Sequence, residues 1–390
     1  MLGRFEKTFP SVEKVQEPLE KMAIWNHINS QLHDLVPYQA GKTISEIRQT
    51  YHLEKIIKLA SNECPLSPSQ KVMNSIYDYL KNMARYPEDF APDLRNKLAK
   101  QNRVHPHQIT FGAGSSEVLE LLLRTFTKPA DNVIISQYGF LFYKWAALSA
   151  NVSVQIVPEI NYHQDLEATL AAINEKTRII FIANINNPTG TWHAREALFS
   201  FIQRVSSDVL IVIDEAYFEY MQEEVNFITA MDWIEQYPNV AVTRTFSKAY
   251  GLAGLRFGYS VTEAKISECM NRLRKAFNVS ELTLVAAQAA LEDIDHLEYV
   301  LKTNQKGKTQ LVNAFEELNL PYLSQSGNFF TVQFGSASQR IAAQLLKEGI
   351  IVRTLEPYHL NDFLRITIGT REENEKLINW LKRNRHDFSK

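Results

Sequence analysis

The chain has 390 residues, 45% of them hydrophobic, and its 42 Lys and Arg against 44 Asp and Glu leave a formal net charge of −2. That length suits a large domain with a smaller one rather than one small core. The balanced charge gives no overall basic field for nucleic acid, and no uncharged apolar run is long enough to cross a bilayer.

We interpret residues 1–34, which are charged and weakly patterned, as an N-terminal arm. The first 20 residues contain charges and prolines but no apolar core of signal-peptide length, so we expect a cytoplasmic protein. The two cysteines, Cys64 and Cys269, have no metal-like spacing. We therefore expect no metal site and no disulfide framework, which fits a reducing compartment.

Residues 35–85 form a segment that we expect to pack with the C-terminal part of the chain. Within it, residues 56–60 have the composition of a short strand. Apolar residues at helical spacing from Val72 onward predict a helix that ends just before Pro87.

Between about residues 90 and 260, strand patterns alternate with helix patterns. The predicted strands are residues 109–111, 132–136, 152–157, 178–183, 209–213 and 240–242, and the predicted helices begin near residues 115, 140 and 166. Continuous β-branched runs indicate strands that are buried on both faces. We therefore predict an α/β fold, with a mostly parallel sheet flanked by helices, for a large domain of residues 86–285.

The remainder of the chain is mainly helical in pattern. Helical spacing covers residues 266–277, 283–291, 297–318, 337–347 and 372–381, and short strand patterns appear between residues 329 and 370. We predict a smaller α+β domain of residues 286–390.

The stretch Thr243–Gly258 contains one lysine, Lys248, and one arginine, Arg256, separated by small or apolar residues. Burial among such groups lowers the pKa of an amine, and a neutral amine can attack an aldehyde. The hydroxyls of Thr245 and Ser247, with the guanidinium, could hold a phosphate. Pyridoxal phosphate needs both an amine partner and a phosphate anchor. The alternative is an ordinary surface lysine in a loop.

Other polar residues follow predicted strands, at the sheet edge where open α/β folds bind ligands. Gly112–Ser116 opens a helix, whose backbone amides and dipole favour an anion. Glu117 stands where a dinucleotide-binding motif needs its third glycine, so one phosphate is the better ligand. A simple tight turn is the alternative.

Asp214 ends the most apolar strand of the chain, where a carboxylate is costly to bury without a cation. A protonated pyridine nitrogen would supply that cation and would keep the ring an electron sink. Tyr217 and Asn187 could reach the phenolic oxygen of the same ring, and Phe140 could stack on its face. The alternatives are a helix N-cap for the aspartate, a turn for the asparagine, and core packing for both aromatics.

Taken together, these segments resemble fold-type-I pyridoxal-phosphate aminotransferases, and they are most similar to the histidinol-phosphate aminotransferase family. The matching segments are Lys58–Glu63, Arg85–Pro87, Gly112–Glu117, Asn186–Gly190, Asp214–Tyr217, Ser247–Arg256 and Leu364–Thr370. Each motif alone is weak to moderate, but their order and spacing across nearly the whole chain are specific. The resemblance implies a seven-stranded sheet in the large domain and pyridoxal 5′-phosphate as cofactor.

The resemblance also implies a role for each cofactor-side position. Lys248 would bind the cofactor aldehyde covalently and move the proton. Asp214 would pair with the pyridine nitrogen, Asn187 and Tyr217 with the phenolic oxygen, and Phe140 with the ring face. The phosphate would be held by Ser115, Ser116, Thr245, Ser247 and Arg256.

On the substrate side, the resemblance implies that Arg365 binds the acidic group of the substrate. Arg353 and Tyr38 are candidates for a second anionic or aromatic contact, and Asn62 is a further substrate-binding candidate. Tyr86 would reach the phosphate of the neighbouring subunit's cofactor, which implies a homodimer.

The implied activity is amino-group transfer from L-histidinol phosphate to 2-oxoglutarate, giving imidazole-acetol phosphate and L-glutamate in histidine biosynthesis. Cys64, Ser67, Thr354 and the stretch 88–92 depart from the family pattern. Those near Cys64 and in 88–92 border the substrate side and so concern the amino donor. The alternatives are an aromatic-amino-acid aminotransferase, a paralogue acting on another amine, a pyridoxal-phosphate decarboxylase, or a non-catalytic regulatory protein.

Overall fold

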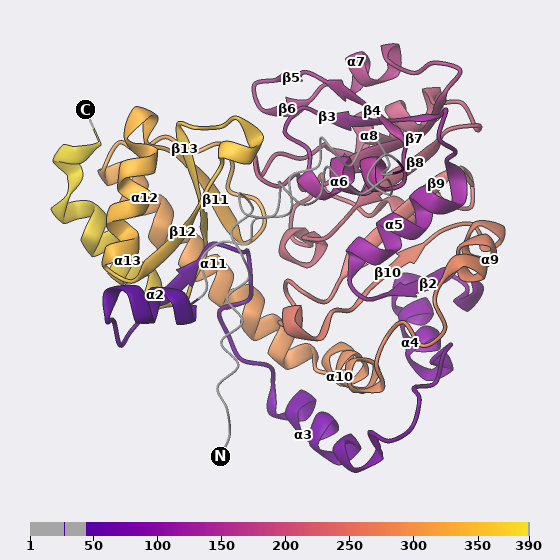
Figure 1. Ribbon diagram of the computed structural model, residues 1–390, viewed down its shortest axis with the longest axis horizontal. Helices are drawn as coiled ribbons and strands as arrows, with labels where there is room; N and C mark the ends of the chain where they lie inside the picture. The colour runs from indigo at the N-terminus through magenta and orange to yellow at the C-terminus, as the bar shows by residue number, and fades with distance from the viewer. Residues whose placement is uncertain (1–26, 28–43, 389–390) are drawn as a thin grey trace. The chain divides into compact units, whose positions relative to one another are not determined.

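The computed structural model describes residue 27 and residues 44–388. The rest of the predicted N-terminal arm, and Tyr38, lie outside the described residues. The helices and strands given below belong to the compact unit formed by residues 39–390 (Figure 1).

The larger of two main sheets has seven strands in the order β2-β10-β9-β8-β7-β3-β4. Their bounds are β2 Ile109–Gly112, β3 Asn132–Ser136, β4 Ser153–Val157, β7 Thr177–Ala183, β8 Leu210–Asp214, β9 Val240–Thr245 and β10 Gly258–Val261. Strand β10 runs antiparallel to both of its neighbours, while the pairings from β9 through to β4 are parallel. The sheet therefore presents the carboxyl ends of β3, β7, β8 and β9 at one edge.

Helices cover both faces of this sheet (Figure 1). The helices of this part of the chain are α3 Gln70–Tyr79, α4 Pro92–Asn102, α5 Ser115–Phe126, α6 Leu141–Ser149, α7 Leu166–Ala171, α8 Arg195–Arg204, α9 Ala264–Leu273 and α10 Glu281–Leu291, and α3 packs on α10. Side chains alternate between faces along a strand. Accordingly, Ile211 and Ile213 of β8 join the core cluster beneath α4, α8 and α10, whereas Leu210 and Val212 join the cluster beneath α5 and α6. This two-sided burial explains the continuous apolar strand patterns.

The smaller sheet has four strands in the order β1-β12-β13-β11. The strands are β1 Ile57–Leu59, β11 Phe329–Gln333, β12 Ile350–Thr354 and β13 Phe363–Thr367, and the helices of this part are α2 Ile44–Tyr51, α11 Ile294–Glu317, α12 Ser338–Lys347 and α13 Arg371–Arg383. A separate core, which includes Leu311, Phe315 and Leu364, fills the space between this sheet and its helices. Strand β1 is parallel to β12, so a segment from early in the chain completes the sheet.

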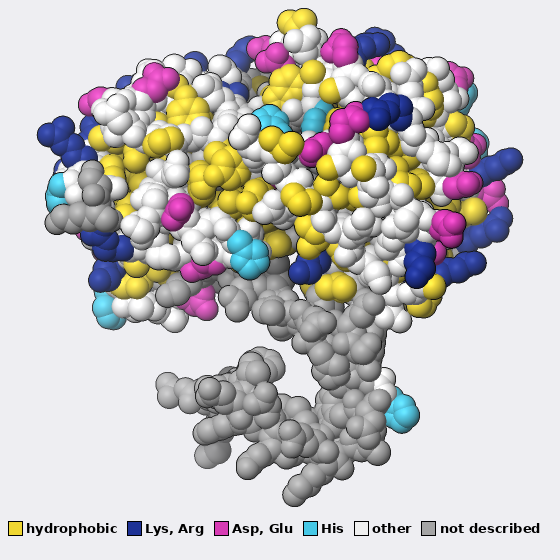
Figure 2. Space-filling model, turned by 90° about the horizontal axis from the view of Figure 1, so that it is seen from above, with side chains coloured by type: hydrophobic (Ala, Val, Ile, Leu, Met, Phe, Trp, Pro, Cys, Tyr) yellow, Lys and Arg dark blue, Asp and Glu magenta, His cyan; other side chains and the backbone are white. Residues whose placement is uncertain are grey.

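The remaining elements are short. They are the hairpin strands β5 Glu159–Ile160 and β6 His163–Gln164, and the 3-10 segments η4 Leu80–Asn82, η5 Pro106–Gln108, η6 Phe218–Met221, η7 Ala230–Trp233, η8 Ala253–Leu255, η9 Gly335–Ala337, η10 Glu356–Tyr358 and η11 Arg385–Asp387. None of the helices in residues 44–388 combines the length and apolar character that a bilayer span requires. On the face shown in Figure 2, positive and negative side chains are interspersed.

The predicted α/β fold with a mostly parallel sheet of seven strands is confirmed. Two details of the sequence interpretation are wrong. The strand predicted to end at Val242 continues to Thr245 and is followed by β10, because Arg244 is buried against Glu215 rather than exposed in a loop. The helix predicted to end before Pro87 ends at Tyr79. The domain limits of 35–85, 86–285 and 286–390 stay a prediction.

Candidate active site

The predicted cofactor residues gather at the carboxyl-end edge of the large sheet. Asp214 is the last residue of β8 and lies opposite Thr243 of β9 in the parallel register. Lys248 follows β9, and Asn187 and Phe140 follow β7 and β3. Because parallel strands end at the same edge, residues far apart in sequence meet there.

Lys248 lies half-buried in the loop after β9, with Nζ 3.4 Å from the carbonyl oxygen of Ser61. Burial and then the positive charge of Arg365 lower its pKa to about 8, against the opposing charge of Glu63. The ammonium also lies 5.5 Å from the ring centroid of Tyr217. The amine is therefore partly neutral near physiological pH, which suits a nucleophile and a proton carrier.

Asp214 is buried and receives two hydroxyl hydrogen bonds, from Tyr143 at 2.9 Å and from Thr243 at 3.1 Å. Burial raises the pKa of this carboxyl, and the two hydroxyls oppose that rise. Burial also raises the pKa of Tyr143 well above its ordinary value, so the phenol stays a donor. Among the described residues no lysine or arginine forms an ion pair with Asp214. The carboxylate can thus accept a cationic partner that the described residues do not supply.

The predicted phosphate site lies at the start of α5. Gly114, with φ of 84°, precedes Ser115 as a cap without a side chain. A Cβ on Gly114 would lie 2.4 Å from Nη2 of Arg256, and one on Gly258 would lie 2.3 Å from the amide nitrogen of Ser115. Both glycines therefore admit close approach between the helix start, the arginine and β10. Nη1 of Arg256 also donates to the hydroxyl of Ser247 at 3.3 Å.

This arrangement joins a guanidinium, hydroxyls and the N-terminus of a twelve-residue helix. The predicted phosphate ligands Ser116 and Thr245 belong to the same two segments, the first turn of α5 and the end of β9. The Thr245 hydroxyl donates to the carbonyl of Phe257 at 3.3 Å and accepts from the amide of Ser247 at 3.1 Å. Such a cluster of donors fits a phosphate.

Tyr217 and Asn187 have partners that leave a donor for a ligand oxygen. Tyr217 is buried and its hydroxyl oxygen accepts a hydrogen bond from Asn62 at 2.9 Å. Burial raises its pKa to about 12, so it remains protonated. The side-chain oxygen of Asn187 accepts from Arg365 at 2.5 Å, which leaves its amide nitrogen as the group that can donate to a ligand.

Arg365 and Arg353 are directly opposite each other on β13 and β12. Opposite residues of antiparallel strands share a face, so both guanidinium groups belong to one side of the small sheet. Arg365 is buried and is held by the carbonyl of Ala60 at 2.7 Å as well as by Asn187. Arg353 is half-buried.

One predicted site residue makes its contact elsewhere, and another lies outside the described part of the chain. Tyr86 is 82% exposed and stacks on Phe277 with ring centroids 4.7 Å apart. Tyr38 lies outside the described residues. Phe140 is half-buried at the start of α6, with its ring edge-to-face against Tyr143 at 5.7 Å. The ring-stacking role of Phe140 and the inter-subunit role of Tyr86 stay predictions.

Sequence reasoning missed the residues that hold the predicted ones in place. Tyr143 has the apolar helix pattern of a core aromatic, and its ring does stack on Phe181 at 4.7 Å. Only the fold shows that its hydroxyl reaches Asp214. Arg244 lies one residue before a predicted phosphate ligand, yet it forms a buried ion pair with Glu215 at 2.7 Å. The sequence signal for this contact is the presence of opposite charges, Glu215 and Arg244, at the ends of two apolar strands.

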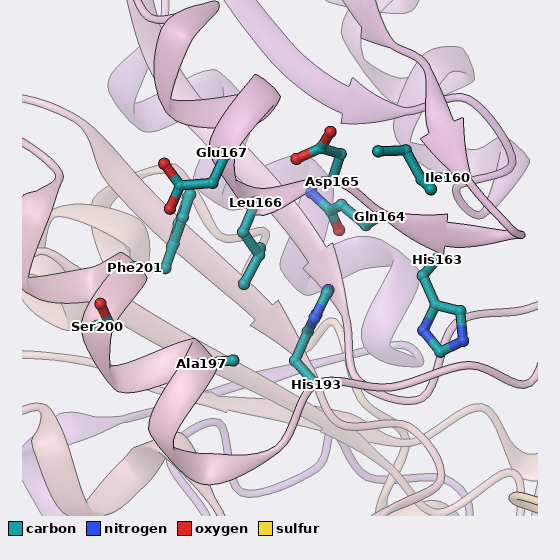
Figure 3. Close-up of a pocket in the computed structure, with 10 residues that line it drawn as sticks. All are labelled: Ile160, His163, Gln164, Asp165, Leu166, Glu167, His193, Ala197, Ser200 and Phe201. Atoms are coloured by element: carbon teal, nitrogen blue, oxygen red, sulfur yellow. The ribbon is translucent and has the colours of Figure 1, made fainter.

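A different cavity, of about 450 Å³, lies between β6, α7 and α8 (Figure 3). His163 and His193 lie on one side of it, and burial lowers the pKa of His193 to about 4. None of the predicted cofactor or substrate residues lines this cavity. The described residues contain no group of three or more potential metal ligands.

The fold and the lysine site define a fold-type-I pyridoxal-phosphate-dependent transferase. The chain belongs to the aminotransferase class I and II family, whose model matches residues 54–381. It is 41% identical to histidinol-phosphate aminotransferase 1 of Idiomarina loihiensis, over 91% of this chain and 97% of that protein. It is 42% identical to histidinol-phosphate aminotransferase 1 of Nitrosococcus oceani, over 89% and 94% of the two chains.

Solved structures agree with this assignment. The histidinol-phosphate aminotransferase of Sinorhizobium meliloti, in complex with pyridoxal 5′-phosphate, superposes with a TM-score of 0.84 at 25% identity, over 92% of this chain and 98% of that one. An aspartate aminotransferase of Thermus thermophilus superposes with a TM-score of 0.79 at 19% identity, over 92% and 99% of the two chains, and shows the fold alone.

The donor set of this chain fits pyridoxal 5′-phosphate. A buried carboxylate without a cationic partner suits the pyridine nitrogen, the cluster at α5 suits the phosphate, and a lysine of lowered pKa suits the aldehyde. When bound, the cofactor supplies a ring that accepts the electron pair of the deprotonated substrate carbon. Asp214 would place a negative charge near the pyridine nitrogen, and the Lys248 amine would be the group that takes and returns the proton.

Proposed function

We propose that this aminotransferase takes the amino group from L-histidinol phosphate and passes it to 2-oxoglutarate, in histidine biosynthesis. The observation that carries the proposal is the facing pair Arg353 and Arg365 in one register of the small sheet. Two guanidinium groups on one face suit a substrate end with two negative charges, such as a phosphate ester. The same pair suits the carboxylates of 2-oxoglutarate.

In this proposal each residue keeps the role that its position supports. Lys248 binds the cofactor and moves the proton, Asp214 pairs with the pyridine nitrogen, and Tyr217 and Asn187 donate to the ring oxygen. Arg256, Ser247, Thr245, Ser115 and Ser116 hold the cofactor phosphate. Arg365 binds the substrate anion, with Arg353 beside it.

The test is a substrate panel on the purified protein with 2-oxoglutarate as acceptor. L-Histidinol phosphate, L-histidinol without the phosphate, phenylalanine and tyrosine are compared by glutamate formation. Charge-assisted hydrogen bonds are worth about 1.5–3 kcal/mol each, so we expect kcat/KM to be ~100-fold higher for the phosphate ester than for free histidinol. Faster turnover of phenylalanine or tyrosine would make the chain an aromatic-amino-acid aminotransferase, and carbon dioxide release would make it a decarboxylase.

Arg365→Lys and Arg353→Gln divide the anion contact between the two arginines. A lysine keeps the charge but loses the forked geometry, so Arg365→Lys should lower kcat/KM for both half-reactions. Arg353→Gln should lower it mainly for the phosphate ester, whose second charge it would meet. Equal losses for phosphorylated and unphosphorylated histidinol in Arg353→Gln would remove this arginine from phosphate recognition.

We further propose a homodimer in the cytoplasm. The support for the dimer is the 82% exposure of Tyr86, beside the exposed side chains of Met83, Phe90 and Phe277. The support for the cytoplasm is that Cys64 and Cys269 form no disulfide. Light scattering on the purified protein would give the mass, and a monomer that retains full activity would remove the role of Tyr86 at a partner's cofactor.

A further inference from the structure

Tyr217 is joined to the small sheet through two other side chains. The amide nitrogen of the Asn62 side chain donates to the Tyr217 hydroxyl at 2.9 Å. The Thr367 hydroxyl donates to the side-chain oxygen of Asn62 at 3.2 Å and accepts from its backbone N–H at 2.9 Å. All three residues are buried, at 3%, 1% and 3% exposure for Tyr217, Asn62 and Thr367. We call this chain of contacts the Thr367–Asn62–Tyr217 relay.

The hydrogen-bond directions in the relay follow from the donor count. The Thr367 oxygen accepts from the Asn62 backbone, and its single proton goes to the Asn62 side-chain oxygen. The Asn62 amide is thereby turned so that its NH₂ faces Tyr217. Since the Tyr217 oxygen accepts that bond, its own proton is not spent on Asn62.

The backbone fixes Asn62 as firmly as its side chain does. Its φ of 52° lies in the left-handed region, which Asn tolerates better than most residues. Its carbonyl oxygen accepts from the Asn328 side chain at 3.1 Å. Each of the four polar groups of Asn62 therefore has a partner within the chain, which favours a positioning role over direct substrate contact.

Thr367 shares its strand with the substrate arginine. Arg365 and Thr367 are two residues apart on β13, so their side chains leave the same face of the strand. A strand placed to hold Arg365 against the substrate anion therefore also holds Thr367 against Asn62.

We propose that Thr367 and Asn62 are positioning residues that turn the Tyr217 hydroxyl into a donor toward the cofactor's ring oxygen. The inference rests on the proposed function, in which Tyr217 lies at that oxygen. A donor there stabilises negative charge on the ring oxygen. It therefore lowers the pH at which the visible absorbance of the bound cofactor changes, and it strengthens cofactor binding.

The experiment measures that pH midpoint and the dissociation constant of pyridoxal 5′-phosphate in the wild type and four variants. Thr367→Val keeps shape but removes the hydroxyl, and Thr367→Ser restores it. Asn62→Asp replaces the donor with an acceptor that would take the Tyr217 proton. Thr110→Val is the control, because Thr110 is an equally buried threonine that is hydrogen-bonded to Ser267 at 2.8 Å in the large sheet.

We expect Thr367→Val and Asn62→Asp to raise the midpoint by about one pH unit, which is the size of one lost hydrogen bond, and to weaken cofactor binding ~10-fold. Thr367→Ser and Thr110→Val should match the wild type in both measurements. If Thr367→Val does not fold, the pH midpoint and the cofactor dissociation constant of Asn62→Asp test the relay.

A midpoint and affinity unchanged in Asn62→Asp, or a shift in Thr110→Val as large as in Thr367→Val, would overturn the relay while leaving the aminotransferase assignment intact. A wild type that binds no pyridoxal 5′-phosphate would instead overturn the proposed function, and the relay with it. A failure of the relay is therefore seen only in the variants, whereas a failure of the proposed function is seen already in the wild type.

Discussion

The two sides of the site are built in different ways. On the cofactor side, the predicted ligands lie at strand ends of one sheet and at a helix start, each within a few residues of an apolar strand. On the substrate side, Asn62 and Arg365 come from segments far apart in sequence. The hydrogen bonds of Asn62 to Tyr217 and of Arg365 to Asn187 join the two sheets. The first side follows from secondary structure alone, whereas the second exists only once the tertiary fold has formed.

The largest expected effect tests the cofactor side at its nucleophile. Lys248→Ala removes the amine that we propose binds the aldehyde and carries the proton. Turnover should therefore fall by about 10⁴-fold or more, and the visible absorbance of the covalently bound cofactor should disappear. Activity and spectra of the purified variant check this. Lys265→Ala, at an exposed lysine of α9, is the matched control and should behave as the wild type. Full turnover without Lys248 would remove the mechanism.

The next largest effect is on stability and concerns the buried ion pair of Glu215 and Arg244. Glu215 is 1% exposed and accepts from Arg244 at 2.7 and 3.0 Å and from the amide of Ala230 at 2.7 Å. Glu215→Gln would remove the carboxylate that is hydrogen-bonded to the buried arginine, so we expect the free energy of unfolding to fall by about 3–5 kcal/mol. Urea unfolding measures this.

The matched control for that loss of stability is a solvent-exposed ion pair on the protein surface. Glu268→Gln breaks the pair of Glu268 and Arg272, which are both exposed on α9, and should leave the urea midpoint unchanged. Equal midpoints for Glu215→Gln and the wild type would show that the buried pair is not what holds β8 to β9.

A smaller effect tests the Tyr143 hydroxyl, which donates a hydrogen bond to Asp214. Tyr143→Phe keeps the ring stacked on Phe181 but removes the 2.9 Å donor, so the pKa of the Asp214 carboxyl should rise further. We expect kcat to fall ~10-fold and cofactor binding to weaken, in line with one lost hydrogen bond to a charged group. Tyr237→Phe removes a hydroxyl that accepts a hydrogen bond from Gln236 at 3.3 Å, and it should change neither. Unaltered kcat in Tyr143→Phe would mean that Thr243 alone suffices.

The smallest effect is a pH dependence of the apoprotein. Since the pKa of Lys248 is lowered to about 8, the rate of cofactor capture should rise as pH passes through 8 and then level off. An amine of ordinary pKa, 10.5, would continue to gain up to that value. Between these two values the unfolded chain binds more protons, so this lysine makes the apoprotein less stable as pH falls from about 10.5 to 8. Stopped-flow absorbance across pH 6–11 measures the capture rate.

The contrast between the two sides also explains what the sequence could predict. Asp214 and Lys248 can be predicted from the sequence because they follow apolar strands. A carboxylate or an amine buried there costs free energy unless it has a partner. Asn62 and Arg365 were placed at the site only by family resemblance, since no local pattern links β1 to β13. Tyr143 was not predicted, because a phenol within an apolar helix face has the same pattern as a core aromatic. The sequence does not predict β10, because β9 extends three residues beyond the apolar run that ends at Val242.

The start of β10 sets a limit on how this chain can vary. Gly258 makes its contribution through missing volume: a single added methyl group would press on the amide nitrogen of Ser115 from 2.3 Å. Mutational scanning should therefore find this position among the least tolerant in the protein, although it donates nothing to any ligand. The predicted phosphate site therefore depends on the absence of a side chain at Gly258 as much as on the charge of Arg256.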